Sequence, residues 1–265
     1  MRIPLHQVDA FSGEVFRGNP AAVCPLDHWL DAALMQAIAV ENNLSETAFF
    51  VPTSGGAPGD FDIRWFTPAA EIDLCGHATL ASAWVVFHRL DPTRTSVTFH
   101  SRSGPLLVER AGELLAMEFP SRPAEPCAPP AGLAEALGRA PRATLVSRDL
   151  LAVYANEDEV RALEPDFGLI RALGVHAVCV TAPGRDCDFV SRFFAPLVGV
   201  PEDPVTGSAH STLVPYWAHR LGKKTLHARQ VSARGGELFC EDLGERVIMA
   251  GRATPYLEGV IEVPG

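Results

Sequence analysis

One combination of turn and helix occurs twice in this chain, and the repeat constrains the fold more than any other feature. The two copies are residues 75–80 (CGHATL) and 206–211 (TGSAHS). Each follows an aromatic segment ending in Phe-x-Pro, and each leads into an apolar stretch ending in His-Arg-Leu. The same offset of 131 residues relates Gly76 to Gly207 and His88 to His219. A constant offset over this length indicates a duplicated domain, with a site where the halves meet.

Length and charge limit the classes of function. At 265 residues, each half is long enough to bury a core of its own. The net charge of -10 and the absence of Lys/Arg runs argue against a nucleic-acid partner. The sequence contains no leader-like or membrane-spanning apolar run, so we expect a soluble, cytoplasmic protein. Small-molecule chemistry is the expected activity.

The cysteines and histidines do not follow the spacing of metal ligands. The six cysteines lack C-x-x-C pairs, and the nine histidines lack an H-E-x-x-H motif. We therefore expect free thiols and no dedicated metal site.

The pattern of apolar residues predicts an α+β fold of two similar domains. The first is expected at 1–120 and the second at 131–251, with a proline-rich linker at 121–130 and a tail, 252–265, that could return to the first domain. The stretch that begins near Gly76 is apolar on nearly every face, so a helix there must be wrapped by other elements. Short strands follow it. Each domain is therefore predicted to be a curved, mostly antiparallel sheet around a central helix.

Gly76 and Gly207 are predicted to stand where a loop enters a helix. The backbone N–H groups of a helix start have no partner within the helix, and two such starts could hold a carboxylate. The simpler alternative is that each glycine only allows the helix to pack closely against a strand.

Three polar side chains next to the repeat are candidates for chemistry, together with a carboxylate further upstream. Asp203 precedes a proline, which favours an extended, projecting loop, and Ser208 follows the repeated glycine. The simpler alternatives are that Glu202 and Asp203 are a solvated pair of acids and that Ser208 merely satisfies the backbone of the helix start. His77 is a candidate acid/base partner. Glu46 begins an apolar strand, where lost hydration would favour proton transfer near neutral pH, although an exposed strand-end acid is the alternative.

Cys75 precedes Gly76 at the same turn and could act as a base or nucleophile. The equivalent position in the second half is Thr206. A mechanism with one thiol on each face of a carbon atom is therefore not available.

Several separate blocks of the sequence resemble the phenazine-biosynthesis (PhzF-like) isomerase family, in the expected order. These blocks are 9–11 (DAF), 18–23 (GNPAAV), 43–49 (NLSETAF), 64–68 (RWFTP), 73–79 (DLCGHAT) and 202–209 (EDPVTGSA). The resemblance implies the diaminopimelate-epimerase-like fold, with two similar domains, a site in the cleft between them, and usually a homodimer.

The resemblance also implies cofactor-independent isomerisation, with the residue at Glu46 moving a proton between carbons. Residues matching His77, Asp203 and Ser208 line the site in the characterised family member. Related epimerases and racemases use one cysteine in each half, and this chain has a thiol only at Cys75.

The leading hypothesis is an isomerase of a small carboxylate. In it, Glu46 carries the proton, His77 and Asp203 orient or relay, and Gly76, Gly207, Ser208 and Cys75 contact the substrate. One alternative is an epimerase or racemase that uses Cys75. Another is a metabolite-binding protein without catalysis, since one fold can carry several functions.

Overall fold

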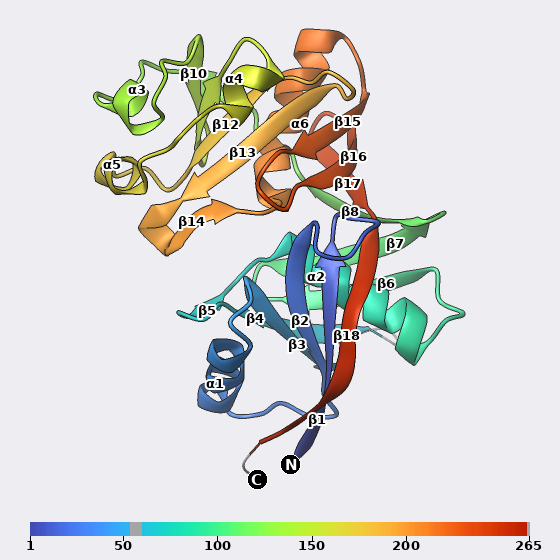
Figure 1. Ribbon diagram of the computed structural model, residues 1–265. Coiled ribbons are helices and arrows are strands. Elements are labelled where there is room, and N and C mark those ends of the chain that lie inside the picture. The colour runs from blue at the N-terminus through green and yellow to red at the C-terminus, as the bar shows by residue number, and fades with distance from the viewer. Residues whose placement is uncertain (54–59, 264–265) are drawn as a thin grey trace. The chain divides into compact units, whose positions relative to one another are not determined.

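The computed structural model describes residues 1–53 and 60–263, and within it the chain forms two compact units (Figure 1). The first unit combines Met1–Glu118 with the C-terminal segment from Ala250 onward, and the second is Phe119–Met249. The end of the chain returns to the first unit because the strand Ala253–Glu262 pairs antiparallel with Arg2–Ala10. The last two residues of the tail, 264 and 265, lie outside the described residues.

The first unit is a curved sheet with one helix at its centre. Its strands are β1 (Arg2–Ala10), β2 (Asn19–Pro25), β3 (Glu46–Pro52), β4 (Phe61–Phe66), β5 (Glu71–Ile72), β6 (Ser96–Ser101), β7 (Gly104–Ala111), β8 (Leu114–Pro120) and β18 (Ala253–Glu262). The helices are α1 (Ala32–Asn42) and α2 (Gly76–Val85), and α2 continues as the π-helical segment η1 (Val86–Leu90). Residues 77–85 of α2 are all buried, as required of a helix that the sheet surrounds.

The second unit has a similar plan with additional short helices. Its strands are β9 (Glu125–Pro126), β10 (Ala143–Val146), β11 (Leu150–Val153), β12 (Val178–Pro183), β13 (Phe189–Ala195), β14 (Val200–Asp203), β15 (Thr225–Gln230), β16 (Gly236–Asp242) and β17 (Arg246–Gly251). Its helices are α3 (Leu133–Ala136), α4 (Glu157–Arg161), α5 (Phe167–Ala172), the 3-10 segment η2 (Pro196–Val198) and α6 (Gly207–Leu221).

Both units pair their strands in the same alternating order. In the first, β1/β2, β3/β4 and β6/β7 are antiparallel, whereas β2/β3 and β4/β6 are parallel. In the second, β10/β11, β12/β13 and β15/β16 are antiparallel, whereas β11/β12 and β13/β15 are parallel. The shared topology confirms the predicted fold class, a duplicated, mostly antiparallel α+β domain.

The central helix of the second unit contains a proline, and the backbone compensates for it. Pro215 has no N–H to donate to the carbonyl of Ser211, four residues earlier in α6. The N–H of Arg122 donates to that carbonyl instead, at 2.8 Å. The buried carbonyl is therefore satisfied despite the proline.

The segment 121–130, predicted to be a linker, forms backbone hydrogen bonds with the second unit. Besides Arg122, the N–H of Ser121 donates to the carbonyl of Glu245 at 2.9 Å, and β9 pairs with β10. Prolines remove only their own N–H groups, so the residues between them still form sheet-like hydrogen bonds.

None of the described helices has the length and hydropathy needed to cross a membrane.

Candidate active site

In the first unit, the start of β3 and the start of α2 bring together three predicted site residues, Glu46, Cys75 and His77. His77 Nε2 lies 2.9 Å from Glu46 Oε2, and His77 Nδ1 lies 3.5 Å from Cys75 Sγ. The side chains of His77 and Glu46 are only 7% and 13% exposed. An imidazole therefore stands between a carboxylate and a thiol in a nearly water-free environment.

The local structure explains how these side chains converge. Cys75 has extended backbone and immediately precedes α2, whose first residue is Gly76. The hydroxyl of Thr79 donates to the carbonyl of Cys75 at 2.6 Å, which fixes this turn. The side chain of Cys75 does not cap the helix, so it remains directed toward His77.

The contact between Glu46 and His77 is close but poorly aligned. Among the described residues, neither Glu46 Oε2 nor His77 Nε2 has a well-formed hydrogen bond. Buried polar atoms in this state cost about 1–3 kcal/mol each, and in native proteins they need an explanation. A bound molecule that contacts both atoms would supply one.

Burial shifts the pKa values of the two neighbours of Glu46 in opposite directions, whereas the charge of Glu46 raises both. Burial alone would lower the pKa of His77, but Cys75 and Glu46 raise it by more, so that it stands well above the ordinary value. Burial, followed by the charge of Glu46, raises the pKa of Cys75. The pKa of the Cys75 thiol is thus raised, and the charge of Glu46 contributes to the raised pKa of His77.

Asn19 belongs to this cluster but is absent from the residues predicted for the site. Its Nδ2 lies 3.3 Å from His77 Nδ1, and the residue is fully buried. The parallel register that pairs Ala21 with Glu46 brings the beginning of β2 next to the beginning of β3. The Gly-Asn-Pro sequence at 18–20 is the pattern that could have pointed to Asn19. Gly18 adopts a φ of 69°, which favours glycine, and Asn19 is a polar residue at the buried start of a strand.

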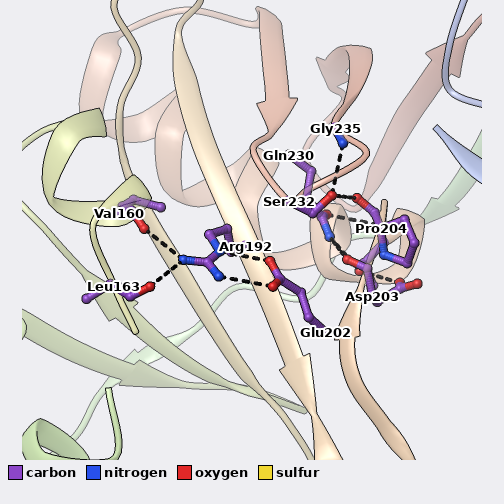
Figure 2. Close-up of polar contacts among 10 residues, drawn as sticks. Val160, Leu163, Arg192, Glu202, Asp203, Pro204, Gln230, Ser232 and Gly235 are labelled. Atoms are coloured by element: carbon purple, nitrogen blue, oxygen red, sulfur yellow. Dashed lines mark hydrogen bonds and ion pairs between the residues drawn. The ribbon is translucent and has the colours of Figure 1, made fainter. Parts of the chain in front are cut away.

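In the second unit, Asp203 lies in a network of hydrogen bonds at the turn before α6 (Figure 2). The hydroxyl of Thr206 donates to Asp203 Oδ2, and Gln230 Nε2 donates to Thr206 Oγ1 at 3.1 Å and to the carbonyl of Asp203 at 2.7 Å. Gln230 Oε1 accepts from the N–H of Thr206 at 2.9 Å. Gln230 was not predicted, because a glutamine at a strand end gives no functional signal in a single sequence.

The hydroxyl of Ser232 stabilises the same turn through two further hydrogen bonds. Its hydroxyl donates to the carbonyl of Pro204 at 2.7 Å and accepts from the N–H of Gly235 at 3.1 Å (Figure 2). The predicted residues Gly207 and Ser208 are the first two residues of α6; Gly207 is buried and Ser208 half-buried.

A half-buried ion pair precedes each turn. Arg192 contacts Glu202 through two hydrogen bonds, of 2.8 and 3.0 Å, and Arg64 contacts Glu71 in the same way, at 2.7 and 2.8 Å. Each guanidinium also stacks over a phenylalanine ring two residues later, Phe194 or Phe66. Glu202 is therefore a structural partner of Arg192 rather than a solvated neighbour of Asp203.

The carboxylate, thiol and imidazole of the first cluster are also potential metal ligands, since one ligand atom from each lies within 4.8 Å of the other two.

Comparisons with known proteins agree with the fold. The profile of the phenazine biosynthesis-like proteins matches residues 8–259. An uncharacterized isomerase of Pseudomonas aeruginosa is 54% identical over 263 residues, covering 99% of this chain and 100% of that protein. A human phenazine biosynthesis-like domain-containing protein is 40% identical over 289 residues, covering 98% of this chain and 99% of that protein.

Solved structures extend the similarity. The crystal structure of a PhzF family protein from Enterococcus faecalis has a TM-score of 0.96 at 46% identity, covering 99% of this chain and 100% of that one. A hydroxyproline epimerase from Agrobacterium vitis shares the fold alone, with a TM-score of 0.63 at 12% identity, covering 98% of this chain and 92% of that one. With the profile match and these identities, the chain belongs to the phenazine-biosynthesis-like (PhzF-like) family of isomerases.

Proposed function

We propose that the protein isomerises a small carboxylate substrate without a cofactor, by moving a proton between two carbons with Glu46 as the general acid/base. The observation that carries this proposal is the buried contact of 2.9 Å between Glu46 and His77, at atoms that lack an aligned hydrogen bond. Such atoms are suited to act on a substrate.

In the first step, a Glu46 carboxylate oxygen takes a proton from an activated carbon. The C–H bond breaks, an O–H bond forms on Glu46, and the electron pair is delocalised into the conjugated substrate. In the second step, the O–H bond of Glu46 breaks and a new C–H bond forms at a different carbon. Atoms and charge balance without a further reactant, and Glu46 returns to its initial state.

His77 has an orienting role in this scheme. A protonated imidazole beside Glu46 holds the carboxylate in position and stabilises its negative charge whenever the proton is on the substrate. The raised pKa of His77 agrees with that role.

The substrate carboxylate would bind at the helix starts. Neither Cys75 nor Thr206 caps its helix with a side-chain hydrogen bond, so the first N–H groups at Gly76 and Gly207 are suited to an anion. We further propose that Asp203 and Ser208 contact the same substrate, and that the protein works as a cytoplasmic homodimer.

Cys75 is the basis of the second candidate, an epimerase or racemase. The thiol touches His77, which favours this candidate, but its pKa is raised by burial and the position equivalent to it is Thr206. A buried thiol is a weaker base at neutral pH than the adjacent carboxylate. Glu46 is therefore preferred as the proton carrier.

The test is deuterium incorporation by purified protein in heavy water, followed by NMR over a panel of small cyclic and amino-acid carboxylates. Once a substrate is found, Glu46→Gln should lower kcat by about 10²–10⁴, because an amide keeps the shape but cannot accept the proton. Glu41→Gln, an exposed residue of α1, is the matched control. Unchanged turnover in Glu46→Gln would refute the proposal.

Two further results would select the alternatives. A large loss of turnover in Cys75→Ala, with Glu46→Gln still active, would favour the thiol-based epimerase. Ligand-induced thermal stabilisation without deuterium in any recovered ligand would favour a metabolite-binding protein.

A further inference from the structure

Gln230 lies buried beside the turn that carries Asp203 and makes three hydrogen bonds to it. It is the last residue of β15 and is only 1% exposed. Its Nε2 donates to the carbonyl of Asp203 at 2.7 Å (Figure 2) and to Thr206 Oγ1 at 3.1 Å. Its Oε1 accepts from the N–H of Thr206 at 2.9 Å. One side-chain amide thus uses both of its N–H groups and its oxygen on a single turn.

The backbone partners of Gln230 fix which way its amide faces. The N–H of Thr206 can only donate, and the carbonyl of Asp203 can only accept. Turning the amide over would place Nε2 against that N–H and Oε1 against that carbonyl, and both hydrogen bonds would be lost. The amide therefore has a single orientation.

The orientation of the amide sets the direction of the Thr206 hydroxyl. Because Thr206 Oγ1 accepts from Gln230, its one proton is available to a different acceptor, and the hydroxyl donates it to Asp203 Oδ2. A chain of directed hydrogen bonds thus runs from Gln230 through Thr206 to the carboxylate. Successive hydrogen bonds of this kind polarise and strengthen one another in a buried environment.

The first unit has the equivalent turn but different residues at the positions of this chain. Subtracting the offset of 131 residues from the three positions gives two apolar residues and a thiol, Ile72, Phe99 and Cys75. Phe99 is fully buried and packs against the rings of Phe50 and Phe61. An apolar side chain at this position is thus compatible with the fold. The three polar residues instead occur together in the unit that carries Asp203.

We propose that Gln230 is a positioning residue of the isomerase. Acting through the hydroxyl of Thr206, it holds the carboxylate of Asp203 in one orientation for the substrate. The importance of that carboxylate for turnover rests on the proposed function, whereas its orientation by Gln230 rests on the hydrogen bonds alone. Gln230 does not touch the substrate in this scheme, so its effect on turnover must pass through Asp203.

The first test measures the orientation of Asp203 without any substrate. Three-bond couplings between Hα and the Hβ protons, measured by NMR on protein with labelled aspartate, report whether the side chain keeps one χ1 rotamer. We expect one rotamer in wild type and in Thr206→Ser, which keeps the hydroxyl. Gln230→Met and Thr206→Val should give averaged couplings, because the donor to the carboxylate is undirected in the first and lost in the second.

Gln36→Met is the matched control. Gln36 is a half-buried glutamine of α1 whose Nε2 donates to the carbonyl of Thr67 at 2.8 Å. Its replacement removes a glutamine–carbonyl hydrogen bond in the first unit and should leave the couplings of Asp203 as in wild type. Circular dichroism and thermal melts identify any variant that fails to fold. Thr206→Val exchanges a hydroxyl for a methyl group of similar size, so it tests the chain even if Gln230→Met does not fold.

Kinetics then test whether the orientation matters for turnover. Gln230→Met and Thr206→Val should each lower kcat by about 10–100-fold, the size of effect expected when a catalytic group is displaced. In a protein that already carries Asp203→Ala, the same two changes should lower kcat by less than about threefold, because no carboxylate is left to position. Thr206→Ser should keep most of the activity. A purely structural role of Gln230 would instead give losses that add.

Two results would overturn the role of Gln230: the same Asp203 couplings in wild type and in both folded variants, or losses of kcat that add fully to that of Asp203→Ala. The proposed function is judged separately. If wild type incorporates no deuterium into any carboxylate of the panel, the isomerase proposal fails, and the couplings alone decide whether Gln230 positions Asp203. If wild type is active and Gln230→Met and Thr206→Val turn over as fast as Gln36→Met, the positioning role fails and the isomerase stands.

Discussion

Buried titratable residues in this protein differ in what surrounds them and therefore in whether burial permits a charge. Glu46 and His77 are buried beside each other, so that charge on one supports charge on the other. His210 is buried at the position equivalent to Thr79, with the ring against Phe189. Both Thr79 and His210 contact the carbonyl four residues earlier, of Cys75 and Thr206 respectively. Both helix starts thus have a side-chain contact to the carbonyl of the residue before the helix, made by threonine in one unit and by histidine in the other.

His210 should make the stability of the protein depend on pH. Burial lowers its pKa from 6.5 to about 4, so the folded state resists protonation that the unfolded state accepts. The stability contributed by neutral His210 is complete above pH 6.5 and is lost as the pH falls toward about 4. The loss has an upper limit on the order of 3 kcal/mol.

Urea unfolding at several pH values checks this expectation. His210→Thr, which copies the residue of the first unit, should show a shallower fall in unfolding free energy between pH 6.5 and 4. An identical pH dependence in wild type and His210→Thr would contradict the assignment.

Gly18 positions Asn19, and its substitution should be costly. It has a φ of 69°, and a Cβ atom there would collide with the carbonyl oxygen of Ala10. Gly112 has a similar φ of 66° but open space around it, so it serves as the control. We expect Gly112→Ala to cost about 1–2 kcal/mol from backbone strain, and Gly18→Ala to cost clearly more. Chemical denaturation of both variants measures the difference, and equal losses would show that the collision is relieved.

Among the elements, the arginine that joins β13 to β14 makes hydrogen bonds to two carbonyls in addition to its ion pair. Besides Glu202, Arg192 Nη1 donates to the carbonyls of Val160 and Leu163, at 3.2 and 2.9 Å (Figure 2). Arg64 contacts Glu71 and stacks on Trp29 and Phe66. Arg192 therefore ties the α4 region to the strand that carries Asp203, through a fork geometry that lysine cannot reproduce.

Arg192→Lys should therefore destabilise the second unit by about 1–3 kcal/mol, since buried carbonyls and one carboxylate oxygen lose donors. The matched variant Arg64→Lys should cost less. Unfolding free energies of the two variants decide the order, and a larger loss for Arg64→Lys would refute this reading of the contacts.

Local elements were predictable where local chemistry decides them. The Asn-x-x-Glu pattern at 156–159 is typical of a helix N-terminus, and the N–H of Glu159 does donate to Asn156 Oδ1 at 3.0 Å. Asp27 is also a residue type that favours a helix start, but α1 begins at Ala32 after Asp31, which makes no side-chain cap. Without a capping bond, the helix start is set by packing, which a single sequence does not reveal.

Glu46, Cys75 and His77 could be named as candidates from the sequence, but their geometry could not be predicted. Cys75 and His77 are two residues apart, so their contact is local. The contact of His77 with Glu46 depends on how α2 packs against β3, and that of Asn19 depends on the register between β2 and β3. These are long-range arrangements, for which apolar periodicity carries no information.

At the scale of the whole molecule, each unit has its own core, with one apolar cluster around Phe49 and Phe66 and another around Tyr154 and Phe194. The first unit is built from both ends of the chain, since β18 pairs with β1 over most of its length. A change in β18 should therefore alter the stability of the unit that contains the N-terminus.

A chain that ends at Gly251 tests this dependence. Loss of β18 leaves the backbone groups of β1 without their partners, so amide exchange in β1 and β2 should accelerate by at least tenfold. Exchange in β12, in the second unit, should stay as in the full chain. Equal acceleration in both units, measured by mass spectrometry, would contradict this division.

The return of β18 also has a consequence for the order of events during synthesis. The second unit is continuous in sequence, so its strands can pair once residues up to Met249 have left the ribosome. The first unit, although most of it is translated earlier, lacks a partner for β1 until β18 has followed. Glu46 and His77 lie in the first unit, so the sheet around them is completed only after the second unit has been synthesised.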